Sequence, residues 1–282
     1  MKIFISGSSG LIGSALADSL KTEGHEVVAL PRTYEKPIDF AGADAVVHLA
    51  GENIAAGRWT AEKKRRIEES RVKGTRHLAE QLAATKEKPS VFICASAIGY
   101  YGDRGSENLD ESSAPGTGFL PDVCKKWEDA TRPAEDDGIR TVRIRTGIVL
   151  STEGGALKKM LPPFKLGGGG VLGNGMHYMS WISLEDEVAI IRYLIDNPNI
   201  NGSVNLVSPN PVTNAEFTKT LGKIIKRPTI IPMPAFAARL LFGEMADALL
   251  LSSARVFPNK LISSGYEFKH PTLESALRSI LA

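Results

Sequence analysis

A glycine-rich turn near the N-terminus, Gly7-Ser8-Ser9-Gly10-Leu11-Ile12-Gly13, is the first segment of the sequence that could do chemistry. It follows an apolar run of strand length and leads into an amphipathic segment of helix length. Glycines at this spacing let the chain turn sharply, bring backbone N–H groups against a phosphate, and let the helix pack closely. The position between a strand and a helix makes a glycine turn without a ligand the weaker interpretation. The turn therefore predicts a site for the pyrophosphate of a dinucleotide.

The end of the second predicted strand decides which dinucleotide fits. A carboxylate there would bind the ribose hydroxyls of NAD, whereas an arginine pairs with the 2′-phosphate of NADP. The chain reads ALPRT at residues 29–33, so Arg32 is the candidate and NADP is the predicted cofactor. An arginine that is simply solvated on a turn is the alternative, because arginine is common in loops.

Small residues end the third predicted strand, in the segment HLAG at residues 48–51. Ligands of open α/β sheets bind outside the carboxyl ends of the strands, so small side chains there let a cofactor lie over the backbone. Close packing of a helix would favour the same small residues. Both interpretations stay open for this segment.

The elements that must position these residues follow from the alternation of apolar runs and amphipathic segments. That alternation is typical of a parallel sheet covered by helices on both faces. The expected strands cover residues 2–6, 26–30, 45–50, 90–95 and 141–146. The expected helices cover residues 11–23, 60–85 and 119–137. The predicted fold class is therefore α/β, a Rossmann-type doubly wound parallel sheet.

Beyond residue 150 the sequence changes character. Residues 154–175 are rich in glycine and contain two prolines, so we expect loops there rather than regular elements. Ser183 is followed by three acidic residues, which predicts a capped helix start with an acidic first turn. Residues 204–207 resemble a further strand, and the chain from Asn214 onward has mostly helical patterning.

These features predict two domains. Residues 1–160 would form an NADP-binding Rossmann domain whose sheet is completed by later segments. Residues 161–282 would form a smaller, mostly helical lobe on the substrate side.

The composition excludes several classes of protein. The net charge is +2 and the charges are interspersed, which argues against a nucleic-acid partner and favours a small molecule. The basic run at residues 63–66 is followed by two glutamates, so we interpret it as a solvated helix face. No apolar run approaches the roughly 20 residues that span a bilayer, and the first ten residues lack a signal-peptide core. Cys94 and Cys124 are far apart, which suits a reducing compartment and forms no metal-ligand cluster. We expect a cytoplasmic protein without a metal, and leave its oligomeric state open.

In combination, these segments resemble a known family. The glycine spacing is similar to that of extended short-chain dehydrogenases/reductases, and the chain resembles the atypical NAD(P)-dependent epimerase/dehydratase-like proteins among them. The segments that carry this resemblance are HLAGENIA (48–55), RW (58–59), SRVKGT (70–75), GYYG (99–102), RTGIVL (145–150), MLPPFKLGGGG (160–170) and PVTNAEF (211–217). In that family a short C-terminal domain of unknown function follows the Rossmann domain, and residues 256–277 resemble it. The resemblance covers essentially the whole chain.

The resemblance implies NADP(H) binding by a defined set of residues. They are Gly7, Ser9, Gly10, Leu11, Ile12, Gly13, Arg32, Leu49, Ala50, Arg71 and Val149. Arg71 also makes physical sense by itself, because a guanidinium can form a fork to phosphate or ribose oxygens. Its alternative is a surface charge on a helix.

The acid/base pair of the wider superfamily is missing. Active members use a Tyr-x-x-x-Lys pair, in which the lysine lowers the pKa of the tyrosine and holds the ribose. No tyrosine in this chain has a lysine four positions later, and Leu120 and Cys124 stand where the pair is expected. Ser96, Tyr100 and Tyr101 are the substitute candidates for catalysis, because they follow a strand end at the same crevice. A turn residue and an aromatic wall are the alternatives for them.

The sequence therefore favours an NADP(H)-dependent oxidoreductase that acts on a small carbonyl or hydroxyl compound. A non-catalytic NADP(H) sensor is one alternative. A nucleotide-sugar epimerase or dehydratase is the other, favoured by analogy within the superfamily and disfavoured by the missing pair.

Overall fold

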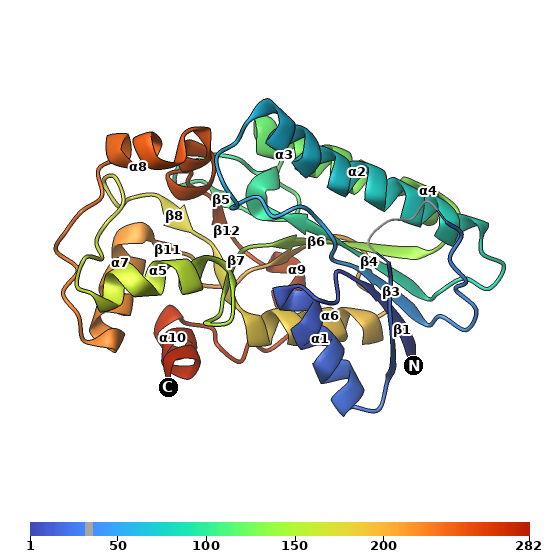
Figure 1. Cartoon of the computed structure of the whole chain (residues 1–282). Helices are drawn as coiled ribbons and strands as arrows, with labels where there is room; N and C mark the ends of the chain where they lie inside the picture. Colours follow the sequence, from blue (N-terminus) through green and yellow to red (C-terminus); the bar gives the residue numbers. More distant parts are fainter. Residues whose placement is uncertain (32–35) are drawn as a thin grey trace.

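A six-stranded parallel sheet is the centre of the molecule, with the strand order β10-β6-β4-β3-β1-β2. Figure 1 labels β6, β4, β3 and β1 of this sheet. The computed structural model describes residues 1–31 and 36–282. The strands are β1 (Lys2–Ser6), β2 (Glu26–Ala29), β3 (Ala45–His48), β4 (Val91–Ala97), β6 (Arg140–Thr146) and β10 (Gly202–Leu206). The predicted Rossmann-type α/β fold is confirmed.

Helices cover both faces of this sheet because its strands are apolar on both sides. Val91 and Ile93 of β4 pack with α1 (Leu11–Thr22) and α6 (Leu184–Asp196). Phe92 and Cys94, which point the other way, pack with α2 (Ala61–Ala84), α3 (Phe119–Asp129) and α4 (Arg132–Asp136). Alternation along one strand thus divides the core into two layers.

The helix expected over residues 119–137 is two helices, α3 and α4. Thr131 separates them and donates a side-chain hydrogen bond to the Glu128 carbonyl, 2.7 Å away. Pro133 follows in the first turn of α4, where its missing N–H costs no helical bond. The amphipathic pattern ran through this break, so the sequence prediction missed it.

The expectation of loops throughout residues 154–175 is wrong for its first half. Residues Gly155–Lys165 form the helix α5 despite Pro162 and Pro163. Leu157, Leu161 and Phe164 recur at helical spacing and are buried in a third core cluster. Burial of that apolar face outweighs the weak helix propensity of the segment, because packing usually decides where propensity is low.

Most of the remaining elements build the lobe beside the sheet. Its helices are α7 (Asn214–Ile225), α8 (Ala235–Phe242) and α10 (Leu273–Leu281), with the single turn η2 (Ala246–Leu250). The short helix α9 (Asn259–Ser263) instead packs against β10, and the turn η1 (Ile98–Tyr100) against α3 and β6. Short strand pairs complete the fold: β5 (Asn108–Leu109) with β12 (Arg255–Val256), β7 (Ile148–Leu150) with β9 (Trp181–Ser183), and β8 (Tyr178–Met179) with β11 (Val212–Thr213). The sheet takes β10 from beyond residue 160, and the boundary between the predicted domains stays a prediction.

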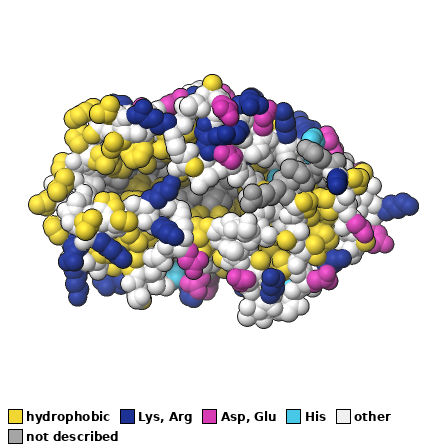
Figure 2. Space-filling view, in the orientation of Figure 1, with side chains coloured by type: hydrophobic (Ala, Val, Ile, Leu, Met, Phe, Trp, Pro, Cys, Tyr) yellow, Lys and Arg dark blue, Asp and Glu magenta, His cyan; other side chains and the backbone are white. Residues whose placement is uncertain are grey.

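The surface shows where these two halves meet. In Figure 2 the molecule is hollowed between the lobe and the half that carries the sheet, and hydrophobic side chains gather over α8. Phe236, Leu240 and Leu241 are among the exposed hydrophobic residues there. Within residues 1–31 and 36–282, no helix is both long and apolar enough to cross a membrane.

Candidate functional site

The glycine turn adopts a conformation that side chains would block. Gly7 has a φ of +69°, and a Cβ there would lie 2.9 Å from the backbone nitrogen of Ala50. A Cβ on Gly13 would lie 2.2 Å from the Gly7 carbonyl oxygen. The helix α1 begins after Gly10, which has no side chain to cap it, so the first N–H groups of α1 remain available to an anion. The turn therefore has the form of a phosphate cradle.

The end of β3 is held beside this cradle by a buried serine. The Ser6 hydroxyl oxygen accepts the backbone N–H groups of Leu49 and Ala50, at 3.1 and 3.3 Å. Its own hydrogen is thereby directed to His48 Nδ1, 2.6 Å away. Burial lowers the pKa of His48 to about 4, so the imidazole is neutral and can accept this bond. The sequence prediction identified Leu49 and Ala50 but missed the pair that positions them.

Arg71 of α2 lies over the same strand end. Its guanidinium is 3.3 to 3.5 Å from where a Cβ on Gly51 would be, and it lies 4.9 Å from the centre of the Trp127 ring. Nη1 donates to the carbonyls of Glu52 and Ile67, at 3.0 and 3.2 Å. Desolvation lowers the pKa of this guanidinium. Arg71 is thus a half-buried cation beside the predicted cofactor segment, and its contact with a cofactor stays a prediction.

The interpretation of residues 63–66 as a solvated face is wrong for Lys63. This side chain is buried, and its ammonium donates to Glu52 Oε1, 2.6 Å away. The bond holds the loop after β3 onto α2 and lowers the pKa of the Glu52 carboxyl. The helical period could have indicated this, since Lys63 shares a face with the buried Ile67.

The loop after β3 also touches the C-terminal lobe. Arg58 donates to the carbonyls of Leu240 and Leu241 in α8, and Lys159 of α5 donates to the Ala55 carbonyl at 2.9 Å. Lys64 forms an ion pair with Glu244. These contacts link the loop after β3 and α2 to α5 and to the C-terminal lobe.

The other predicted cofactor residues lie around the start of α1. Leu11 is 3.3 Å from where a Cβ on Gly154 would be, and the Val149 carbonyl is 3.3 Å from the corresponding position at Gly155. The structure thus places Leu11 and Val149 close to each other, both beside the start of α5. Ser9 and Ile12 belong to the turn and first helical turn. Arg32 lies outside the described residues, so the expected 2′-phosphate contact stays a prediction.

Ser96, near the end of β4, bonds to a side chain of α3. Alternation along β4 directs it to the α3 face, where its hydroxyl donates to Glu128 Oε1 at 2.7 Å. Glu128 also accepts two bonds from Arg145, at 2.8 and 2.9 Å, and one from Ser203 at 3.0 Å. The side chains of Glu128 and Arg145 are 11% and 4% exposed, so this is a buried ion pair. Ser96 is thus bonded to this pair, and its catalytic role stays a prediction.

Tyr101 belongs to the same buried network. Its hydroxyl lies 2.7 Å from Asn205 Oδ1 and 2.9 Å from the Asp110 carbonyl, and it accepts from Arg145 Nη1 at 3.0 Å. Burial raises the pKa of Tyr101 to about 12. Tyr100 is half-buried, and the Arg145 guanidinium lies 3.5 Å from the centre of its ring. The geometry gives Tyr101 a structural place and leaves Tyr100 as the more accessible of the two.

The helix face on which the superfamily would carry its tyrosine and lysine is closed by packing. Leu120 Cβ and Cys124 Sγ lie 3.5 and 3.6 Å from where a Cβ on Gly99 would be.

Cys94 and Cys124 are free and buried, and burial raises the pKa of each thiol to about 12. In the part of the chain that the structure describes, no three His, Cys, Asp or Glu side chains form a metal-ligand group.

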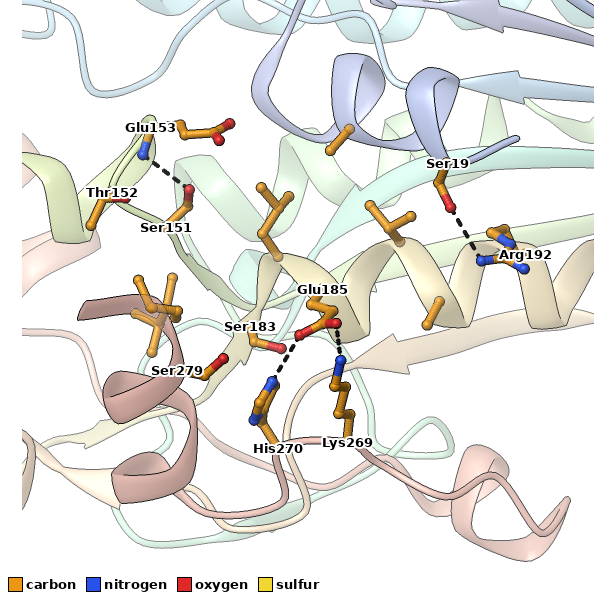
Figure 3. A pocket seen from close by; sticks show the side chains of 16 residues that line it. Ser19, Ser151, Thr152, Glu153, Ser183, Glu185, Arg192, Lys269, His270 and Ser279 are labelled. Atoms are coloured by element: carbon orange, nitrogen blue, oxygen red, sulfur yellow. Dashed lines mark hydrogen bonds and ion pairs between the residues drawn. The ribbon is translucent and has the colours of Figure 1, made fainter. Parts of the chain in front are cut away.

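A second hollow, of about 500 Å³, lies between α1, α6, residues 150–153 and the C-terminal segment. Figure 3 shows Glu185 there with bonds to Lys269 and to His270, the latter 2.9 Å long. Asp186 accepts the backbone N–H groups of the same two residues, at 2.8 and 3.0 Å. Glu185, Lys269 and His270 are thus engaged with one another, while Arg192 bonds Ser19 and Glu23. The glycine turn, whose N–H groups can receive a phosphate, remains the better candidate site.

Comparisons with known proteins find two family models, which match separate parts of the chain. A model of the NAD dependent epimerase/dehydratase family matches residues 3–206, and one described as a domain of unknown function, DUF1731, matches residues 233–280. The chain is 44% identical to the epimerase family protein Mb2239 of Mycobacterium bovis, over 98% of this chain and 96% of that one.

Two solved structures are also similar. The crystal structure of human epimerase family protein SDR39U1 (isoform2) with NADPH superposes with a TM-score of 0.94 at 32% identity, over 99% of each chain. The nucleoside-diphosphate sugar epimerase from Corynebacterium glutamicum is 38% identical with a TM-score of 0.80, over 100% of this chain and 58% of that one.

Proposed function

This chain belongs to the NAD dependent epimerase/dehydratase family, as the sequence resemblance predicted, and from that premise we propose that it is an NADP(H)-dependent oxidoreductase. Its substrate would be a small carbonyl or hydroxyl compound. The observation that carries the proposal is the similarity, over 99% of both chains, to a human protein whose crystal structure contains NADPH. The cradle at Gly7 and Gly13 supports the proposal independently.

The residues present fit a dinucleotide. The backbone of the glycine turn would hold the pyrophosphate at the start of α1, where N–H groups and the helix dipole favour negative charge. Leu49 and Ala50, fixed by Ser6, would lie along the cofactor, and Arg71 would supply positive charge beside it. A bound nicotinamide supplies hydride chemistry, which the protein side chains cannot supply themselves.

The experiment that tests cofactor choice is a fluorescence titration of the protein with NADPH and with NADH. We expect NADPH to bind about ten- to a hundredfold more tightly, because a charge-assisted contact from Arg32 contributes roughly 1.5–3 kcal/mol. Arg32→Asp should weaken NADPH and spare NADH. Equal affinities in the wild-type protein would contradict the role of Arg32, and absence of binding would contradict the proposed function.

A nucleotide-sugar epimerase is the second candidate, favoured by the name of the similar protein from Corynebacterium glutamicum. Incubation with UDP-glucose and either oxidised dinucleotide distinguishes the two. Formation of an epimeric sugar without net reduction of the dinucleotide favours the epimerase, whereas NADPH consumption with a carbonyl compound favours the oxidoreductase. A cytoplasmic location remains part of the proposal, supported by the two free thiols.

A further inference from the structure

A buried acid lies under the carboxyl edge of the sheet, away from the Ser96 and Tyr101 network. Glu187, in the first turn of α6, is fully buried. Its Oε1 accepts a hydrogen bond from the Thr146 hydroxyl, 2.8 Å away. Its Oε2 has no hydrogen-bond partner among the residues that the structure describes. An unpaired, buried carboxyl oxygen is costly, so a compensating use is expected.

Thr146 connects this acid to the crevice. It is the last residue of β6 and is half-buried, and it pairs in register with Ala97, the last residue of β4. Ligands of parallel sheets bind outside these strand ends. Thr146 therefore has one side on the buried acid and lies at the edge where a ligand would bind.

The charged groups near Glu187 are engaged elsewhere. On α6, Glu185 pairs with Lys269 and His270, and Asp186 accepts the backbone amides of those two residues. On β6, Arg145 points to the opposite face of the sheet and pairs with Glu128. The adjoining strands β4, β7, β9 and β10 bring apolar or neutral side chains. Burial consequently raises the pKa of the Glu187 carboxyl to about 8.

We infer that Thr146 and Glu187 form the proton-donating pair of this crevice, in place of the missing tyrosine and lysine. The inference rests on the proposed oxidoreductase function. Thr146 would be the group that touches the substrate oxygen, and Glu187 would act through it. The two residues are 41 positions apart in the chain, and the end of β6 and the first turn of α6 bring them together.

The proton balance is simple for reduction of a carbonyl compound. The carbonyl carbon receives the hydride that the proposed cofactor supplies, and the carbonyl oxygen receives the Thr146 hydroxyl proton. The Glu187 proton moves to Thr146 Oγ1, since a hydroxyl can both donate and accept at 2.8 Å. Glu187 is left as a carboxylate and regains a proton from solvent when the product leaves. The reverse sequence serves oxidation of an alcohol.

The first test needs neither cofactor nor substrate. The folded protein holds the Glu187 proton between the usual glutamate pKa, about 4.3, and about 8, whereas the unfolded chain has released it, so stability falls as the pH rises through this range. Relative to Glu187→Gln, the wild-type unfolding constant in urea should rise by up to about tenfold per pH unit. Glu185→Gln, on the same helix, is the matched control and should retain the wild-type loss. Parallel profiles for wild type and Glu187→Gln would overturn the inference.

If Glu187→Gln does not fold, the inference can be tested on the wild-type protein by infrared spectroscopy. Infrared spectra at pH 7 should show the carbonyl stretch of one protonated carboxyl group, and this band should disappear as the pH rises above about 8. Absence of the band at pH 7 would also overturn the inference.

The second test joins the pair to function. Thr146→Val should bind NADPH like the wild-type protein yet reduce simple aldehydes and ketones about a hundredfold more slowly or worse, whereas Thr146→Ser should retain turnover. Glu187→Gln should lower turnover below pH 8 and flatten its pH profile. Thr141→Val, on the same strand and distant from this edge, is the control.

The outcomes separate the two proposals. Turnover that survives Thr146→Val overturns the pair and leaves the proposed function standing. Absence of NADPH binding, or NADPH binding without reduction of any carbonyl compound, overturns the proposed function and the role of the pair with it.

Discussion

The two sides of the sheet edge are built in different ways. At β1 and β3, backbone groups of the glycine turn and of Leu49 and Ala50 form the predicted cofactor site. At β4 and β6, buried side chains from distant segments form the network of Ser96, Glu128 and Arg145. The first side depends on local conformation, and the second depends on the register of the strands. Substitutions on the two sides should therefore change different properties.

Arg145→Met should have the largest effect, on stability. It leaves the Glu128 carboxylate buried without its counter-charge, which costs about 3–5 kcal/mol in the free energy of unfolding. Urea denaturation measures this loss. The matched control is Arg66→Met, which breaks an exposed pair with Glu62 and should cost about 0–1 kcal/mol. Equal losses of stability for the two variants would show that the buried Arg145–Glu128 pair matters no more than an exposed ion pair.

Gly13→Ala should instead weaken cofactor binding. The new Cβ would meet the Gly7 carbonyl oxygen at 2.2 Å, so the turn must shift. A shifted turn no longer aims its N–H groups at the phosphate, and a loss of about 1.5–3 kcal/mol of hydrogen bonding to a charged group corresponds to roughly ten- to a hundredfold in NADPH affinity. Gly168→Ala, where the added carbon meets only an ordinary contact at 3.5 Å, should bind normally. Normal NADPH binding by Gly13→Ala would show that the turn is not the phosphate cradle.

Arg71→Ala should weaken NADPH and NADH by similar factors of about tenfold, because the guanidinium lies beside the strand end and not at the predicted 2′-phosphate site. Fluorescence titration with both dinucleotides measures this. Lys73→Ala, two positions along the same helix and exposed, is the control. Unchanged affinities would leave Arg71 as a cation that only supports the loop after β3.

The smallest expected effect distinguishes the two adjacent tyrosines. Tyr101→Phe should lower the free energy of unfolding by about 0.5–1.5 kcal/mol, since it removes buried hydrogen bonds to Asn205 and Arg145. Tyr100→Phe should change stability less, because that residue is half-buried. Chemical denaturation of both variants makes the comparison. The opposite ranking would place Tyr100 in the structural role.

The sequence predicted those parts of the molecule that depend on local signals. The glycine turn, the six strands and the start of α6 after Ser183 each follow from short patterns, and all lie within a few residues of their expected places. The helix α5 was missed because its prolines and glycines suggested loops. Its buried face became clear only once the lobe it packs against was known.

The candidate catalytic residues were harder to predict. Their contacts depend on which face of a strand each side chain occupies and on partners that are far apart in the sequence. The sequence places Ser96 at a strand end, but its bond to Glu128 follows from which face of β4 it occupies, and one position along a strand reverses that face. Thr146 shares a face of β6 with Val142 and Ile144, a signal that could have directed attention to α6. Its partner Glu187 looked like an ordinary acidic residue of a helix first turn, and its burial could not be inferred from the local sequence.

The alkylation rates of the two buried cysteines report how often the structure around each of them opens. Thiols react with alkylating reagents as thiolates, so Cys94 and Cys124, with pKa values raised to about 12, react only when the structure around them opens. Cys124 lies on α3 and Cys94 in the central strand β4. The ratio of their alkylation rates therefore compares how often α3 detaches from the sheet with how often the sheet itself unfolds.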